Sequence, residues 1–312
     1  MNTIMKKIFL FPIFILLALV SMAQQEALYT HYMFNSLEMN PAYAGSRGCM
    51  SFVALHRSQW AGFDGAPTTQ SFGMNSPILG GKMGLGLSYN GDRIGPIRSS
   101  MFSLSGSYIA KLNENTTMAF GLNSGFQSVN ANLSDLNLYE VNDASFLGNA
   151  SSKLTPNFGA GVFIQNQKFY FGVSSPRILE TRFVANKDNG LELLQSKRHY
   201  YVTAGAIMPL GKQVQFKPSI LMKTVPGAPA QLDATAMFVF HEKFWTGISS
   251  RSGDALGALI GFNFNDNLQV GYAYDWSYAF GQHAGRSGSH EVVLRYELTY
   301  KQVAKIKSPR YF

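Results

Sequence analysis

The sequence is short of cysteine, of charge and of long apolar runs, and each shortage excludes a class of protein. Cys49 is the only cysteine among 312 residues, which excludes an internal disulfide and a metal cluster built on cysteines. Charged residues make up 14% of the chain, against roughly 25% in an average soluble domain. After residue 23 no apolar stretch reaches the roughly 18 residues of a membrane-spanning helix. A mature chain that crosses a membrane must therefore be a closed β-barrel, because lipid cannot satisfy an open sheet edge.

Motifs for catalysis and for cofactor or metal binding are also missing. The six histidines are scattered and form no zinc-binding motif, and no G-x-S-x-G elbow occurs. Successive glycines such as Gly84 and Gly86 lack the third glycine and the helix of a dinucleotide site. Ser289 and His290 are neighbours on a predicted strand, so their side chains face opposite ways. We expect no enzyme, no cofactor and no metal. The scattered lysines and arginines, with no run or recognition motif, also indicate no nucleic-acid partner.

The first 23 residues have the features of an export signal. Lys6 and Lys7 form a basic start, Ile8 to Val20 is apolar apart from Pro12, and Ser21-Met22-Ala23 fits a cleavage site. We expect the mature chain to begin at Gln24 and to reach the cell outer membrane.

The mature chain is dominated by alternation at period two, which predicts β-strands. Large apolar residues occupy one face and small or polar residues the other, as in 118–126 and 83–90. A soluble sandwich would carry many charges on its second face, so this pattern favours a barrel whose apolar face meets lipid. Aromatic residues at strand ends fit interfacial girdles, and we expect this role for four of them: Tyr89, Trp245, Trp276 and Tyr300.

The pattern predicts an all-β protein, a transmembrane antiparallel β-barrel of about 14 strands with a short N-terminal segment. The predicted strands are 50–57, 68–76, 82–91, 98–110, 116–126, 157–164, 168–175, 198–208, 213–223, 230–240, 244–251, 255–264, 267–276 and 289–300. Every second connection is short, and the long connections lie between them, which is the layout of periplasmic turns and surface loops.

The chain then divides into four parts. These are a signal peptide, 1–23; an N-terminal periplasmic or lumenal segment, 24–49; the barrel, 50–300; and a basic periplasmic tail, 301–312. In the second part we expect a short helix, followed by a turn at Asn40-Pro41, because proline keeps the residue before it out of helical geometry.

Three segments of the chain resemble the PorP/SprF family of the type IX secretion system. They are Met39-Asn40-Pro41-Ala42-Tyr43-Ala44-Gly45, then His56-Arg57-Ser58-Gln59-Trp60 with Gly62-Phe63-Asp64-Gly65-Ala66-Pro67-Thr68-Thr69, and Ser308-Pro309-Arg310-Tyr311-Phe312. The resemblance implies an outer-membrane barrel that supports export or surface anchoring of large adhesins, often linked to gliding motility. It implies as partners the C-terminal region of a secreted adhesin and a periplasmic secretion or motility component, besides outer-membrane lipid.

Candidate partner-binding residues come from these motifs, and each also has a local structural interpretation. They are Asn40, Pro41, Tyr43, Arg57, Trp60, Pro67, Arg310, Tyr311 and Phe312. Trp60 also fits the membrane interface, and Pro67 fits a turn. Two other functions stay open. The first is a channel like the fatty-acid transporters, in which 24–49 would plug the lumen, although that segment is short for a plug. The second is a passive porin, which would need a lumen that residues 24–49 do not occupy.

Overall fold

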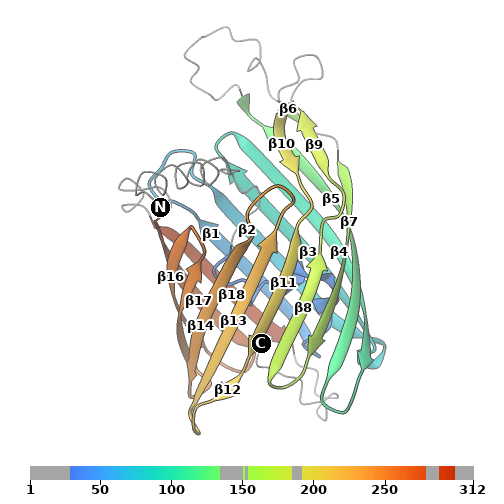
Figure 1. Cartoon of the computed structure of the whole chain (residues 1–312), viewed down its shortest axis with the longest axis vertical. Helices are drawn as coiled ribbons and strands as arrows, with labels where there is room; N and C mark the ends of the chain where they lie inside the picture. Colours follow the sequence, from blue (N-terminus) through green and yellow to red (C-terminus); the bar gives the residue numbers. More distant parts are fainter. Residues whose placement is uncertain (1–28, 134–149, 152–153, 185–191, 279–287, 299–312) are drawn as a thin grey trace, which may run out of the picture.

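The computed structural model describes residues 29–133, 150–151, 154–184, 192–278 and 288–298. These residues form a closed antiparallel β-barrel of 14 wall strands, as the alternation predicts. Figure 1 shows the strands tilted around a common axis. No helix of the described residues is long and apolar enough to cross a membrane.

The wall strands follow one another around the barrel in chain order. They are β1 (Met50–Ser58), β2 (Thr68–Ile78), β3 (Met83–Ile94), β4 (Ile97–Lys111), β5 (Thr117–Ala131), β7 (Thr155–Gln165), β8 (Phe169–Ser175), β11 (Tyr200–Ala206) continued by β12 (Met208–Pro209), β13 (Val214–Thr224), β14 (Gln231–Phe240), β15 (Phe244–Arg251), β16 (Ala255–Asn263), β17 (Leu268–Ser277) and β18 (Ser289–Leu298). The pairing of β1 with β18, which sets Met50 opposite Leu298, closes the barrel.

Three further short strands lie in the connections at one end of the barrel. β6 (Ala150–Ser151) extends the pairing of β5, and β9 (Thr181–Val184) pairs with β10 (Glu192–Ser196) as a separate two-stranded sheet. The sequence predicted only a loop in 176–197, because strands of four and five residues are too short for alternation to stand out. We call this end the long-loop end, and the opposite end, with tight connections such as Leu79–Gly81, the turn end.

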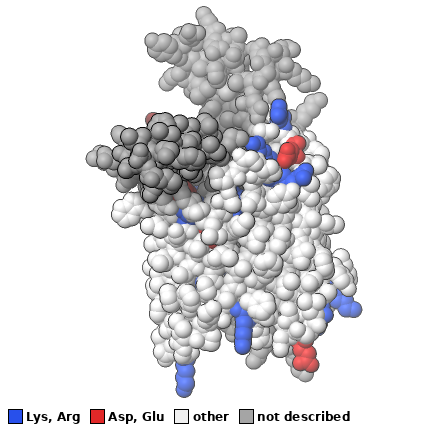
Figure 2. All heavy atoms as spheres, in the orientation of Figure 1, with Lys and Arg blue, Asp and Glu red and all other residues white. Residues whose placement is uncertain are grey.

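The apolar faces of the strands point outward, as predicted. In β5, Leu122 is 70% exposed while its neighbour Gly121 faces the lumen and contacts the N-terminal segment. Leu85 on β3 and Tyr272 on β17 are exposed in the same way. On the face seen in Figure 2, most charged atoms lie toward the two ends of the barrel, with a mainly uncharged band between them. Such a band is the surface that hydrocarbon requires.

One predicted interfacial aromatic lies elsewhere. Tyr89 and Trp276 are exposed on the outer surface, and Trp276 is 64% exposed. Trp245 is 2% exposed and lies inside the lumen, so the prediction for Trp245 is wrong. Its indole ring lies over two wall glycines, Gly261 and Gly271, whose missing side chains leave the space it fills. Tyr300 is outside the described residues.

The N-terminal segment contains a short helix and a turn, as predicted. Helix α2 (Ser36–Met39) ends at Asn40, and a single 3-10 turn, η1 (Pro41–Tyr43), follows. Asn40 is extended, with φ −141° and ψ 111°, which is the geometry that a following proline imposes. Its side-chain Oδ1 accepts a hydrogen bond from the amide of Ala42 at 3.0 Å and caps the turn.

A charge on the outer face should impair insertion more than a charge on the inner face. We expect Leu122→Arg to cost about 2–4 kcal/mol, because its side chain meets hydrocarbon. Asn123→Arg replaces the neighbouring residue, which donates a hydrogen bond to Pro176 O inside the barrel, and should insert more readily. The fraction of heat-modifiable protein in the membrane measures the difference, and equal insertion of both variants would contradict the outward assignment.

Candidate functional site

The lumen of the barrel is filled by residues 29–49, which we call the plug. Most of its side chains are buried, including those of Tyr32, Leu37 and Tyr43. Thr30 contacts Asp275, near the long-loop end of β17, whereas residue 49 leads directly into the start of β1 at the turn end. The plug therefore runs along the lumen from one end to the other. A barrel of about eight strands is filled by its own side chains, so 14 strands leave room for such a segment.

The Asn40–Gly45 part of the plug lies on wall glycines of β3, β5, β7 and β8. A Cβ atom on Gly84 would stand 2.1 Å from Ala44 O, and one on Gly121 would stand 2.2 Å from Ala42 N. A Cβ atom on Gly161 would stand 2.1 Å from Asn40 Oδ1. These glycines are the small inward residues seen in the alternation, and the close approach of the plug is the reason that they must be small.

Polar wall side chains satisfy backbone carbonyls of plug residues 39–46. Ser174 donates to Met39 O at 2.6 Å, Ser107 donates to Ala44 O at 2.7 Å, and Gln165 donates to Ser46 O at 2.7 Å. In return, Asn40 Nδ2 donates to Val162 O at 3.0 Å. A buried backbone carbonyl without a partner is costly, so these bonds fix one position of the plug.

A carboxylate from the wall holds the long-loop end of the plug. Glu291 is fully buried and accepts hydrogen bonds from the backbone amides of Thr30 at 2.9 Å and His31 at 2.7 Å, and it contacts His31 Nδ1 at 2.7 Å. Arg57 Nη1 donates to the same carboxylate at 3.1 Å, and Arg57 Nη2 forms an ion pair with Asp275 at 2.7 Å. Paired charges of the wall thus bind the start of the plug, at Thr30 and His31.

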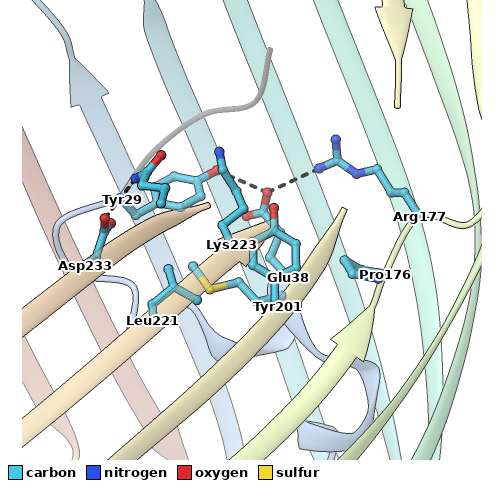
Figure 3. Close-up of a pocket in the computed structure, with 10 residues that line it drawn as sticks. Tyr29, Glu38, Pro176, Arg177, Tyr201, Leu221, Lys223 and Asp233 are labelled. Carbon is cyan, nitrogen blue, oxygen red and sulfur yellow. Dashed lines mark hydrogen bonds and ion pairs between the residues drawn. The ribbon is translucent and has the colours of Figure 1, made fainter. Parts of the chain in front are cut away.

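A second group of polar contacts surrounds Glu38 of the plug. Its carboxylate accepts hydrogen bonds from Tyr29 at 3.1 Å, Asn35 at 2.7 Å and Ser71 at 2.8 Å, and Arg177 lies 3.9 Å away. Figure 3 shows this carboxylate between Tyr29 and Arg177, above Tyr201 and Leu221 of the wall. Glu38 therefore joins the plug to the wall on several sides.

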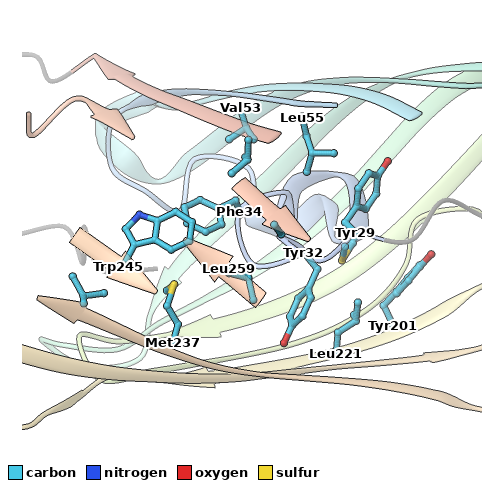
Figure 4. Close-up of a cluster of buried hydrophobic side chains, with 14 residues drawn as sticks. Tyr29, Tyr32, Phe34, Val53, Leu55, Tyr201, Leu221, Met237, Trp245 and Leu259 are labelled. Atoms are coloured by element: carbon cyan, nitrogen blue, oxygen red, sulfur yellow. The ribbon is translucent and has the colours of Figure 1, made fainter. Parts of the chain in front are cut away.

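Apolar packing, a cation–π contact and an ion pair hold the turn end of the plug. Phe34 stacks on Trp245 with ring centroids 5.3 Å apart, next to Met237 and Leu259 in one buried cluster (Figure 4). Arg295 lies over the Phe34 ring, 4.5 Å from its centroid, and donates to Phe34 O at 3.2 Å. Arg47 pairs with Glu297. The lumen is thus less uniformly small and polar than the sequence predicted.

The comparisons with known proteins decide the family. The family model described as type IX secretion system membrane protein PorP/SprF matches residues 21–296. The chain belongs to the PorP/SprF family. No curated protein matches it.

Solved structures of membrane barrels resemble this PorP/SprF chain at low identity. The outer membrane protein Omp33 of Acinetobacter baumannii is 9% identical, with a TM-score of 0.47, over 80% of this chain and 99% of that one. The toluene transporter TbuX of Ralstonia pickettii is 10% identical, with a TM-score of 0.47, over 85% and 93%. A FadL homologue of Pseudomonas aeruginosa is 11% identical, with a TM-score of 0.45, over 85% and 94%.

The candidate partner-binding residues fall into three places in this PorP/SprF chain. Asn40, Pro41 and Tyr43 lie together in the plug, whereas Arg57 lies apart from them at the long-loop end with Glu291 and Asp275. All four are buried in the lumen, so contact with a partner would require the plug to move. Trp60 and Pro67 lie in the β1–β2 connection, where Trp60 N donates to Ser289 Oγ at 3.3 Å and Pro67 O accepts from Gln59 N at 2.9 Å. Arg310, Tyr311 and Phe312 lie outside the described residues.

The alternation in the sequence did not single out the wall residues that bind the plug. Glu291, Asp275 and Glu297 stand at alternate positions that face inward, opposite outward neighbours such as Val292 and Trp276. A charge on the inward face of a strand was the available signal, because that face otherwise carries small residues. Among the described residues, no group of His, Cys, Asp or Glu is arranged to hold a metal.

Proposed function

We propose that this chain is an outer-membrane component of the type IX protein secretion system and supports export or surface anchoring of large adhesins. The family match supports the secretion system, and the filled lumen is the single observation that supports a platform rather than a conduit. A folded or extended adhesin cannot pass where Tyr32, Phe34 and Tyr43 already pack against the wall. The adhesin therefore uses the outer surfaces of the barrel.

The role proposed here is non-catalytic. Two buried carboxylates of the lumen are engaged in holding the plug, since both oxygens of Glu291 accept hydrogen bonds and Asp275 is shared by Thr30 and Arg57. Groups held in this way stabilise one arrangement of the chain. The proposed partners are the C-terminal region of an adhesin and a periplasmic secretion or motility component.

The long-loop end should face the cell exterior, with the turn end in the periplasm. Cysteines at Asp64 and at Lys212, each in a Cys49→Ser background, replace exposed residues at the two ends. On whole cells, an impermeant thiol reagent should label the cysteine at position 64 and leave the one at position 212 unlabelled. The reverse result would invert the topology and remove support for surface loops at the long-loop end.

The basic tail is the proposed contact with the periplasmic partner, because Arg310, Tyr311 and Phe312 are of residue types common in interface hot spots. Deleting Ser308–Phe312 should leave the barrel inserted and abolish surface display of the cognate adhesin, measured by antibody binding to whole cells. The matched control replaces the same five residues with Ser and Gly. Normal display in the deletion would refute docking by the tail, and failed insertion would make the tail an assembly signal instead.

A channel for hydrophobic small molecules is the second candidate. One observation favours it, a pocket beside the plug that is lined by Met33, Phe34, Met237, Val239 and Trp245. Lys217 and Arg295 line the same pocket, and a buried cation is unfavourable next to an apolar molecule. The secretion platform is therefore the better-supported function.

A further inference from the structure

An arginine pair on the outer wall is unexplained by the plug. Arg93 on β3 lies directly opposite Arg98 on β4, and both side chains are exposed. Both share the outward face of their strands, Arg93 with Tyr89 and Arg98 with Phe102. Directly opposed residues of a strand pair have Cβ atoms roughly 5 Å apart, and like charges there are destabilising. Neither guanidinium has a hydrogen bond or ion pair with any residue that the structure describes.

Between the middle of the barrel and this arginine pair, the outward residues of β2–β5 form three successive rows of different chemistry. Four strands place an aromatic residue in one row, in the register Phe72, Tyr89, Phe102, Phe126, and all four are exposed. The next outward row toward the long-loop end is small or polar: Gln70, Gly91, Ser100 and Ser128. The third row holds Thr68, Arg93, Arg98 and Asn130. Four residues of strand separate the aromatic row from the arginines, a length of about 13 Å.

We propose that the outward surface of β2–β5 at the long-loop end is a binding site for a phosphorylated glycolipid of the outer leaflet. Acyl chains lie against the aromatic row, sugar hydroxyls meet the polar row, and Arg93 and Arg98 bind a phosphate between them. Arginine binds phosphate through paired, charge-assisted hydrogen bonds, and the bound anion removes the repulsion between the two cations. This inference rests on the proposed outer-membrane topology, in which the long-loop end meets the outer leaflet.

The site is tested on the purified full-length protein in neutral detergent, apart from any secretion assay. The probes are bisphosphorylated lipid A, the same lipid without phosphates, and inorganic phosphate. The wild type should bind the phosphorylated lipid at least about tenfold more tightly than the dephosphorylated one, and Arg93→Gln/Arg98→Gln should lose that preference. Lys82→Gln/Lys111→Gln is the matched control, because it removes two exposed cations from the turn end of the same strand pair. It should bind like the wild type.

A second variant separates binding from folding. Arg93→Glu sets a glutamate opposite Arg98, so its thermal midpoint in lipid-free detergent should equal or exceed that of the wild type, while lipid binding is lost. Retained binding in Arg93→Glu or in the double glutamine variant would overturn the site. Equal binding of the dephosphorylated lipid would overturn it too, and full competition by an equal concentration of inorganic phosphate would make it a site for free phosphate. A loss of adhesin display would not change lipid binding by the purified protein, so the glycolipid site and the role in secretion can be refuted independently.

Discussion

Replacing Gly121 with valine should open the lumen of this barrel to ions. The new Cβ atom would stand 2.2 Å from Ala42 N and 2.4 Å from its Cα, both atoms of the plug backbone. Neither chain can give way by a rotamer change, and β5 is fixed by pairing with β4 and β7 along its length. Overpacking of this kind costs about 1–3 kcal/mol even where the neighbours adjust, so the plug should leave its place. Conductance of the purified protein across a planar bilayer measures the opening.

The control for this variant is Gly106→Val. Gly106 lies on the neighbouring strand β4, opposite Leu122, and nothing stands within 4 Å of its added Cβ atom. It should stay closed, as the wild type should. A wild-type protein with a steady conductance would contradict the filled lumen and favour a channel, and a closed Gly121→Val barrel would show that the plug tolerates the side chain.

Replacing Glu291 with alanine should cause the largest loss of stability of any single change considered for this chain. It removes the acceptor for two plug amides and leaves Arg57 with Asp275 as its remaining ion-pair partner. Breaking a buried ion pair by removing one partner costs about 3–5 kcal/mol, and the unpaired amides add to this cost. The free energy of unfolding, measured by urea titration in detergent or lipid, should fall by at least that amount.

The matched control is Val292→Ala, at the next position of β18. Val292 is 45% exposed on the lipid face and takes no part in holding the plug. Its replacement should cost much less than that of Glu291. Similar losses in the free energy of unfolding at the two positions would mean that the buried carboxylate contributes no more than outward methyl groups. Such a result would contradict the role of Glu291 in holding the plug.

The wall of the barrel could be predicted from the sequence because its signals are local. Alternation within β5, for example, places Phe120, Leu122 and Phe126 on one face, and lipid is the solvent that such a face requires. Each of the 14 predicted strands corresponds to a wall strand, and the short helix before Asn40-Pro41 is present as well.

The contents of the lumen could not be predicted in the same way, because they depend on contacts between distant parts of the chain. Trp245 alternates with Phe244, so both faces of β15 begin with a large aromatic residue and the pattern cannot choose between them. The choice is made by Gly261 and Gly271 on the next two strands, which leave the indole its space. The short length of 24–49 argued against a plug. Residues 29–49 suffice because inward side chains such as Trp245 fill part of the lumen, and because wall glycines let the plug lie directly against the wall.

The ion pairs of Arg57 are other contacts between distant parts of the chain. In sequence, Arg57 belongs to the motif that ends at Trp60, and it predicted a partner surface. In the structure its guanidinium reaches Glu291 and Asp275, residues more than two hundred positions away. Only the closure of the barrel between β1 and β18 brings them together.

Crosslinking of the plug to the wall in native membranes tests the filled lumen most directly. Cysteines at Ala44 and Gly86, in a Cys49→Ser background, would have Cβ atoms about 3.3 Å apart, close to the separation in a disulfide. A protease site in the β1–β2 connection then cuts the chain between them. After mild oxidation and cleavage, the two fragments should stay joined on a denaturing gel until a reductant is added, whereas the pair at Ala44 and Gly106 should separate. Separation of the fragments in the Ala44–Gly86 variant would contradict the placement of the plug.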